Sequence, residues 1–120
     1  MTIDPADTGA ASEPTARIGT GHDEGPAVVV LGHLRVDPAD RDQYLAACRD
    51  IIVAARVAPG CMDFHLSADP LEGDRINVVE RWASAAAVEA FRGAGAGDEQ
   101  TPTFRSAAVD QIEVGVVVRL

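Results

Sequence analysis

The segment at residues 75–84, with the sequence RINVVERWAS, is the part of the chain that most constrains its fold. Side chains of a strand point alternately to its two faces, so residues 75–82 are expected to form a strand with one largely apolar face. That face carries Ile76, Val78, Glu80 and Trp82, the only tryptophan of the chain. A carboxylate and an indole on an apolar face need a partner, solvent or a ligand. The end of this strand is therefore the best candidate for a functional site.

The composition indicates one globular domain of modest size, because the chain has 120 residues of which 47% are hydrophobic. Its formal net charge of −9 argues against nucleic acid and anionic membrane surfaces as partners, since a phosphate-binding face needs clustered cations. The two cysteines fit neither a disulfide framework nor a metal quartet. No signal-like or membrane-spanning apolar run is visible, so we expect a cytoplasmic protein.

The first 26 residues differ from the rest of the chain. They are rich in small, polar and acidic residues and contain few bulky apolar side chains. Such a segment buries too little apolar surface to offset the entropy of ordering it. We therefore expect residues 1–26 to be a disordered acidic tail and residues 27–120 to form the folded domain.

Four strands are expected in the folded domain, at residues 28–36, 61–67, 75–82 and 112–119, because apolar and polar residues alternate in each. A strongly amphipathic helix is expected between the first two strands, with Asp37 as N-cap, Pro38 at the first helical position and Pro59 after its end. A second helix, capped by Ser84, is expected to follow the third strand and to end near Arg92.

A glycine-rich segment at residues 93–97 and a short helical turn around Phe104, at residues 102–108, are expected to lead to the last strand. The glycine-rich segment is either a plain connector or a flap that admits a ligand.

The resulting order β-α-β-β-α-β is typical of a ferredoxin-like α+β fold with an antiparallel sheet. The strand order would be 4-1-3-2, with both helices on one face of the sheet. The opposite face would be uncovered and would present Leu31, His33, Asn77, Val79, Arg81 and Val117. A domain of this size buries only a small core by itself, so a homodimer formed through the open sheet face is expected.

Three segments carry a resemblance to a known family: residues 32–38 (GHLRVDP), residues 55–61 (ARVAPGC) and residues 80–84 (ERWAS). With them the chain resembles the antibiotic biosynthesis monooxygenase (ABM) domain family of dimeric α+β barrels. The resemblance spans most of residues 27–92. It implies the same fold and, for many members, oxygenation of quinols, anthrones and related aromatics without metal or flavin. The family also includes isomerases and haem-degrading relatives, so the resemblance supports the fold better than the reaction.

The sequence departs from the family at two positions. Many members carry a histidine on the second helix, about nine residues after the tryptophan, where this chain has Phe91. Haem-degrading relatives also have an asparagine on the first strand, where this chain has Gly32. The departures disfavour haem chemistry, and we expect no cofactor and no metal.

A cleft is expected between the helices and the sheet, lined by Leu34, Met62, Phe64, Val78, Glu80, Trp82, Val88, Phe91 and Phe104. The apolar members are explained by core packing alone, or they form a slot for a flat aromatic substrate. In the second interpretation Trp82 supplies a stacking face and an N–H donor.

Glu80 has two interpretations. Buried acids are usually paired, so it forms a salt bridge or a hydrogen bond, or else its pKa is raised by apolar walls and it acts as a general base. A base that removes a phenolic or quinol proton makes an electron-rich anion that reacts with O2. His33 and His65 fall on the opposite face, with one strand between them, and are expected at dimer contacts rather than on a shared metal.

The leading hypothesis is a dimeric, cofactor-independent monooxygenase of secondary metabolism that acts on a small hydroxylated aromatic or quinol and O2, with Trp82 and Glu80 as catalytic residues. The alternatives are an isomerase or a non-catalytic module that binds a small hydrophobic metabolite. A third, weaker hypothesis is a structural dimer whose acidic tail recruits a partner.

Overall fold

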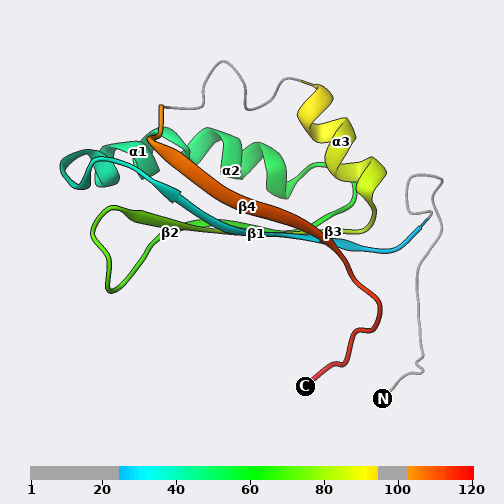
Figure 1. The fold of residues 1–120 in the computed structure, drawn as a ribbon. Helices are drawn as coiled ribbons and strands as arrows, with labels where there is room; N and C mark the ends of the chain where they lie inside the picture. The colour runs from blue at the N-terminus through cyan, green and yellow to red at the C-terminus, as the bar shows by residue number, and fades with distance from the viewer. Residues whose placement is uncertain (1–24, 95–102) are drawn as a thin grey trace.

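The computed structural model describes residues 25–94 and 103–120 (Figure 1). The tail predicted at residues 1–26 lies outside the described residues except for its last two. The glycine-rich segment at residues 93–97 also lies largely outside them. The helices and strands run in the order β1 (Val28–Arg35), a 3-10 helix (Pro38–Asp40), α1 (Arg41–Ala47), α2 (Arg49–Arg56), β2 (Cys61–Ala68), β3 (Arg75–Trp82), α3 (Ala85–Gly93) and β4 (Ser106–Glu113).

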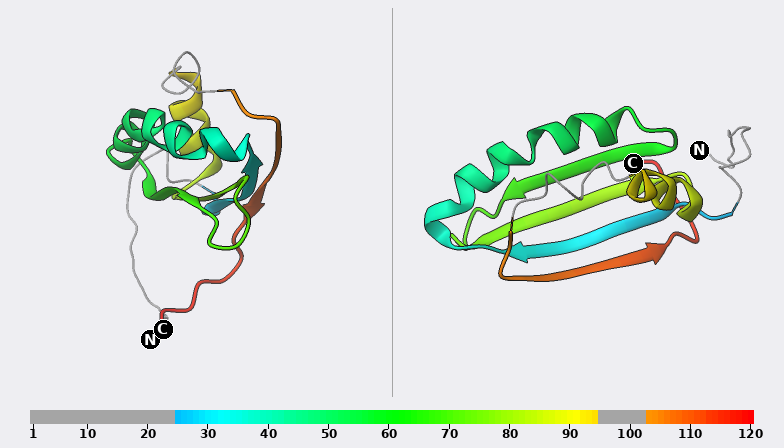
Figure 2. Two further views of the ribbon diagram at one scale, coloured as in Figure 1. Left: turned by 90° about the vertical axis from the view of Figure 1, so that its left-hand side faces the viewer. Right: turned by 90° about the horizontal axis from the view of Figure 1, so that it is seen from above.

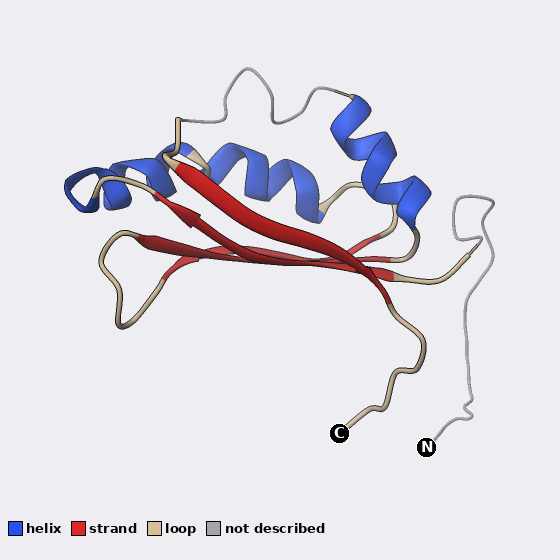
Figure 3. Cartoon of the chain, viewed as in Figure 1, coloured by secondary structure: helices blue, strands red, loops and turns tan. Residues whose placement is uncertain are grey.

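The sheet has the order β2-β3-β1-β4, and each neighbouring pair is antiparallel. The helices form a layer on one face of the sheet. Figure 3 shows the helices in blue and the strands in red. Helices α1 and α2 contact β2, while α3 contacts β3. Seen from above, α1 and α2 lie toward the β2 edge and no helix runs along β4 (Figure 2). The predicted ferredoxin-like α+β fold and its strand order are thus confirmed.

The first helical region has the predicted start but not the predicted continuity. The carboxylate of Asp37 accepts a hydrogen bond of 2.9 Å from the backbone N–H of Ala39, with Pro38 in the first turn. The region then divides into α1 and α2 at Cys48, whose N–H is shared between the carbonyls of Tyr44 and Leu45. Shared bonds of this kind are common where a helix ends, so the two helices continue one another with only a local irregularity.

The core of the domain lies between the helices and the sheet and has two parts. The first lies at the β3–α3 end and contains the buried residues Val28, Ala55, Phe64, Trp82, Ala87 and Val88. The second lies at the α1 end and contains Val36, Tyr44, Cys48 and Ile76. The amphipathic stripe predicted for the first helix supplies residues to both parts, as its apolar spacing requires.

The last strand is not where the sequence pattern placed it. We predicted residues 112–119, but β4 is Ser106–Glu113 and pairs along the whole of β1, from Val28↔Glu113 to Arg35↔Ser106. The helical turn predicted at residues 102–108 is also wrong, because residues 103–105 are not helical and β4 begins at Ser106. All eight side chains of β4 are exposed, so backbone pairing rather than apolar burial defines this strand, and the valine-rich pattern farther along misled the prediction.

Gly32 lets β4 approach β1 closely. Its φ is +156°, and a Cβ atom at this position would lie 2.0 Å from the backbone oxygen of Ala108. No other residue type has room there, because real carbon–oxygen contacts are far longer. Gly32 is therefore required by the pairing of the two strands.

The turn between β2 and β3 is organised by Asp69. Its Oδ2 accepts hydrogen bonds from the backbone N–H groups of Leu71 and Glu72, at 3.0 and 2.9 Å, and its Oδ1 accepts one of 2.9 Å from the side chain of Asn77. These bonds, that of Asn77 foremost, lower the pKa of Asp69 to about 2. One ionised carboxylate thus holds this turn in place.

The sheet face opposite the helices carries exposed apolar side chains. The strand registers place Leu31 opposite Val79 and His33 opposite Asn77 on this face, as predicted. Leu31 and Val79 are 39% and 40% exposed. Val117, which we predicted on this face, lies beyond the end of β4, and Ile112 takes the corresponding place beside Val29.

Among the described residues, no helix is both long and apolar enough to cross a lipid bilayer.

Candidate functional site

Trp82 and Glu80 are joined by a hydrogen bond at the end of β3. Both side chains lie on the helix side of the sheet, where Trp82 is 0% and Glu80 9% exposed. The indole Nε1–H donates to Glu80 Oε1 over 2.9 Å. The predicted inward direction of the two side chains is therefore confirmed, and the N–H donor expected to meet a ligand is used by the neighbouring carboxylate.

The ring of Phe91 packs against the indole and against a second aromatic ring. The ring centre of Phe91 lies 5.4 Å from that of Trp82 with an interplanar angle of 35°, and 6.2 Å from that of Phe64 at 66°. These are separations at which aromatic pairs attract. Trp82 is thus part of the packed core, and Phe91 packs against the ring that we expected to stack on a flat ligand.

Glu80 combines burial with two favourable contacts. Burial raises the pKa of its carboxyl, because the charged form loses hydration, while the bond from Trp82 and the charge of Arg92 act in the opposite direction. Burial is the largest of the three effects, so the pKa lies above its ordinary value of 4.5. A carboxylate in this state is a stronger base than an exposed one.

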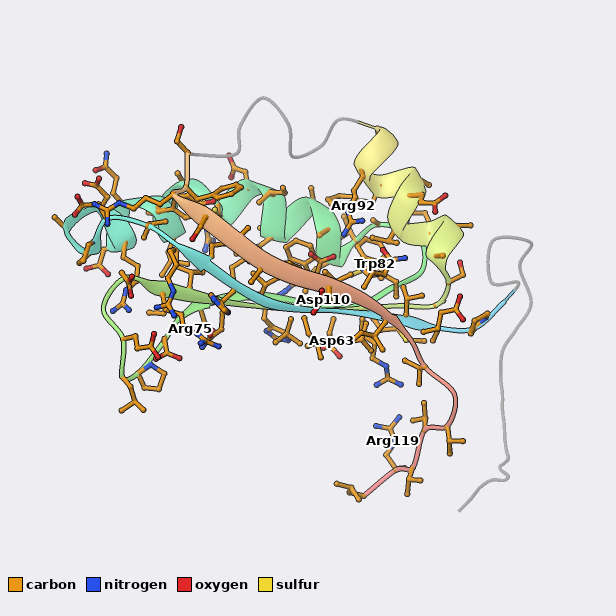
Figure 4. All side chains as sticks on the ribbon, in the orientation of Figure 1. Asp63, Arg75, Trp82, Arg92, Asp110 and Arg119 are labelled. Atoms are coloured by element: carbon orange, nitrogen blue, oxygen red, sulfur yellow. The ribbon has the colours of Figure 1, made fainter. Side chains whose placement is uncertain are left out.

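Two polar residues beside Glu80 were missed by the sequence prediction. Arg92, on the last turn of α3, lies near Trp82 (Figure 4) and donates a hydrogen bond of 3.4 Å to the side chain of Gln111 on β4. The registers align Glu80, Val30 and Gln111 in one row across three strands. Arg92 spans this row, because it contacts Gln111 and its charge acts on Glu80. Gln111 carried no usable signal, since its strand was predicted to begin after it.

Most of the other predicted cleft residues are buried on the helix side. Phe64, Val78 and Val88 are buried, and Leu34 is half-buried against the second part of the core. Phe104 is 42% exposed and not helical, so its prediction as part of a helical turn over the cleft is wrong.

Met62 was also predicted inside and is 51% exposed. The pairing of β2 with β3 shifts between Cys61 and Asp63, which leaves Met62 as the extra residue of a β-bulge. Cys61 therefore pairs with Trp82, and Phe64 pairs with Glu80. Three positions along β2 thus lie opposite two positions along β3. Simple alternation fails across a bulge, and this is why Met62 was assigned to the wrong face.

Cys48 and Cys61 form no disulfide bond. Both are free, and burial raises the pKa of each thiol.

His33 and His65 lie on the face opposite Trp82, separated by β3 as predicted. Within residues 25–94 and 103–120, no group of three or more His, Cys, Asp or Glu side chains could hold a metal ion.

These features define a class of small α+β proteins in which an acid and an indole are enclosed between an antiparallel sheet and its helices. Residues 27–108 match the family described as antibiotic biosynthesis monooxygenase (ABM). The chain belongs to this family, as its resemblance indicated.

Individual relatives are more distant. An uncharacterized protein of Synechocystis, sll1783, is 27% identical over 62 residues, which are 52% of this chain and 42% of that protein. The match thus spans less than half the length of this relative. A conserved protein of Methanosarcina mazei has the same fold, with a TM-score of 0.67, 14% identity, and coverage of 76% of this chain and 95% of that one. The heme-degrader MhuD of Mycobacterium tuberculosis, with two hemes bound in its active site, gives a TM-score of 0.59 at 24% identity, over 77% and 99% of the two chains.

Proposed function

We propose that this protein is a cofactor-independent monooxygenase of secondary metabolism that oxidises a hydroxylated aromatic, quinol or anthrone-type small molecule. Family membership supports an ABM-type function, and one observation supports this reaction within it. Glu80 is a buried carboxylate with a raised pKa at the end of β3. In this proposal Glu80 is the general base, and Trp82 positions its carboxylate through the indole N–H.

The proposed reaction begins with transfer of a phenolic or benzylic proton from the substrate to Glu80. The substrate anion passes one electron to O2, and the resulting substrate radical and superoxide combine to form a C–O bond. Glu80 returns its proton to the peroxide anion. Loss of water then breaks the O–O bond and the remaining C–H bond, leaving a carbonyl group. One O2 thus supplies one oxygen atom to the product and one to water.

Arg92 has a supporting role in this scheme. Its guanidinium is always charged and acts on Glu80 from α3. The same charge would stabilise the substrate anion once Glu80 has taken the proton and become neutral. The bond from Arg92 to the neutral side chain of Gln111 is long, at 3.4 Å, and is easily exchanged for one to a substrate.

The residues present do not fit haem. The ring of Phe91 offers no atom that binds iron, and Gly32 has no side chain. Of the described residues, the two histidines, His33 and His65, lie on the other face of the sheet.

We also propose that the protein is a homodimer formed through the open sheet face. Leu31, Val79 and Ile112 expose apolar surface there, at 39%, 40% and 46%. The segment after β4 leaves the sheet toward the same side (Figure 1) and exposes Val116, Val117, Val118 and Leu120. Apolar surface of this kind on a small domain is typical of a protein interface.

The test is oxygen uptake by metal-stripped protein with a panel of quinols and anthrones. Glu80→Gln should lower the rate by about 10²–10⁴-fold, the usual contribution of a general base. Glu89→Gln is the matched control, because Glu89 is an exposed acid on α3. Absence of turnover with every substrate, or equal rates for Glu80→Gln and the wild type, would contradict the proposal.

Trp82→Phe tests the positioning role. The substitution keeps an aromatic ring but removes the N–H bond that favours the charged carboxylate, so the pKa of Glu80 should rise further. The rising limb of the pH–rate profile should therefore move to higher pH. A lower rate at an unchanged pH profile would assign Trp82 a packing role only.

A second candidate function is an isomerase or a binding module for a small hydrophobic metabolite. The complete burial of Trp82 favours it, because proton transfer by Glu80, or simple binding, requires no stacking face. An isomerase would give product under anaerobic conditions at an unchanged rate, whereas the oxygenase would stop. A binding module would show ligand-induced thermal stabilisation without product.

A further inference from the structure

A pocket lies beside α1, and we propose that it binds a small organic cation that carries hydroxyl groups, such as an amino sugar or an amino alcohol. Its volume is about 310 Å³. The pocket is lined by Asp40, Gln43, Tyr44, Ala47 and Thr103. None of these residues belongs to the Trp82–Glu80 site, and α1 lies at the opposite end of the domain from Trp82 (Figures 1 and 4). The proposal does not depend on the oxygenase reaction.

The spacing of the lining residues explains how the pocket forms. Positions 40, 43, 44 and 47 follow the three-and-four spacing of a single helix face, so α1 and its N-terminal residue supply one wall. Thr103 approaches from the segment that precedes β4. The pocket is thus formed by side chains of two segments that lie far apart in the sequence.

Tyr44 is the strongest indication that the pocket has a ligand. The residue is only 5% exposed, and no other described residue forms a hydrogen bond with its hydroxyl. Leaving a buried hydroxyl unpaired costs about 1–3 kcal/mol. Burial raises the pKa of Tyr44 to about 12, so the hydroxyl is neutral and can both donate and accept a hydrogen bond. Since Tyr44 lines the pocket, a ligand bound there would pair with this hydroxyl in place of water.

Asp40 determines the charge of the ligand. The nearby Asp37 is already paired, with Arg105 at 3.1 Å. The carboxylate of Asp40 forms no ion pair or hydrogen bond with the described residues. An uncompensated carboxylate on a chain of net charge −9 attracts cations and repels anions.

The remaining groups favour a hydroxylated ligand over a bare ion. The side chains of Gln43 and Thr103 are exposed and, like that of Asp40, form no polar contact with another of residues 25–94 and 103–120. Together they offer an amide and two hydroxyl groups beside one carboxylate, whereas Ca²⁺ sites usually collect several carboxylates. At about 30 Å³ for each water-sized group, the volume accommodates about ten such groups, which is the size of a hexosamine.

The test is an NMR titration of the full chain with glucosamine, with glucose as the matched neutral ligand. Glucosamine should shift the backbone signals of α1 in a saturable manner, and glucose should bind at least about tenfold more weakly because it lacks the ammonium group. Equal affinity for the two sugars, or no saturable shift with glucosamine, would overturn the proposal. Equal shifts produced by Ca²⁺ would also overturn it, since they would identify a metal site.

Three variants locate the binding to this pocket. Asp40→Asn should weaken glucosamine binding about tenfold and Tyr44→Phe about threefold or more, each by loss of one polar contact. Asp42→Asn should leave binding unchanged, because Asp42 is an exposed acid of the same helix outside the pocket. Asp40 is exposed, so its substitution remains informative should Tyr44→Phe fail to fold. Equal binding by Asp40→Asn and the wild type, or equal losses for Asp40→Asn and Asp42→Asn, would overturn the assignment.

Discussion

The ring of Phe91 lies against that of Trp82, with their centres 5.4 Å apart, and thereby closes the aromatic part of the candidate site from the α3 side. Trp82 is completely buried as a result of this and its other contacts. A planar ligand that stacked on the indole from the α3 side would first have to displace Phe91. Access to the site and stability of the core therefore depend on the same side chain.

Phe91→Ala should destabilise the protein by about 1–3 kcal/mol, less than the 3–5 kcal/mol typical of a fully buried phenylalanine, because Phe91 is only half-buried. Trp82 is the only tryptophan, so its fluorescence reports the change directly and should shift to longer wavelength. Phe104→Ala, at a 42% exposed position, is the control and should change stability by less than about 0.5 kcal/mol. Unchanged emission in Phe91→Ala would show that the ring does not shield the indole.

Glu80→Gln should stabilise the protein at pH 7 but not at pH 4. The pKa of Glu80 is raised in the folded state above 4.5, so the folded protein holds this proton more tightly than the unfolded chain. Stability therefore falls as pH rises through the window above 4.5, and a neutral amide removes this loss. Urea unfolding at both pH values measures the difference, with Glu89→Gln as the exposed control. A gain of equal size at pH 4 and pH 7 would be inconsistent with this origin.

Asp69 should give the opposite pH dependence. Its pKa is lowered to about 2 from an ordinary value of 3.8, so its contribution to stability is complete above about pH 4 and is lost as pH falls toward 2. Asp69→Asn should therefore be less stable than the wild type at pH 6, with a difference that shrinks on acidification. Asp42→Asn, at an exposed acid of α1, serves as the control. A difference that persists unchanged at pH 2 would show that geometry rather than charge is responsible.

Gly32→Ala should destabilise the pairing of β1 with β4 by about 1–3 kcal/mol or more, as over-packing does elsewhere. The added Cβ would lie 2.0 Å from the backbone oxygen of Ala108. Gly73→Ala is the matched control, because nothing lies within 4 Å of a Cβ atom there. Amide exchange of β4 would detect local loss of pairing even where global unfolding changes little. Equal stability of the two variants would mean that β4 adapts without cost.

Val79→Asp should dissociate the proposed dimer, because it places a charge in the centre of the open sheet face. Val53→Asp introduces the same charge at a 54% exposed position on α2, away from that face, and should leave assembly unchanged. Sedimentation velocity measures the outcome. A monomeric wild type, or a Val79→Asp variant of unchanged mass, would contradict the dimer.

Much of the fold could be predicted because its signals are local. Asp37 and Ser84 cap their helices as expected, and Ser84 Oγ accepts a bond of 3.1 Å from the backbone N–H of Ala87. The β4 strand could not be predicted, because its exposed side chains follow no apolar pattern and its position depends on pairing with Gly32 and the rest of β1.

The candidate site was predicted only in part, because local sequence patterns determine some of its features and tertiary packing determines the others. Alternation along β3 placed Glu80 and Trp82 correctly, since that strand is regular. Their mutual bond and the cover provided by Phe91 depend on side-chain conformation and on the packing of α3, which periodicity does not report. Arg92 and Gln111 meet only through the tertiary structure.

The extra residue at Met62 also affects how this chain should be compared with its homologues. A relative with a regular second strand would have one residue fewer there, so the gap in an alignment belongs at Met62 and not in the preceding turn at Gly60. Misplacing it by one or two columns would match Cys61 with a solvent-facing residue and obscure which positions surround the indole.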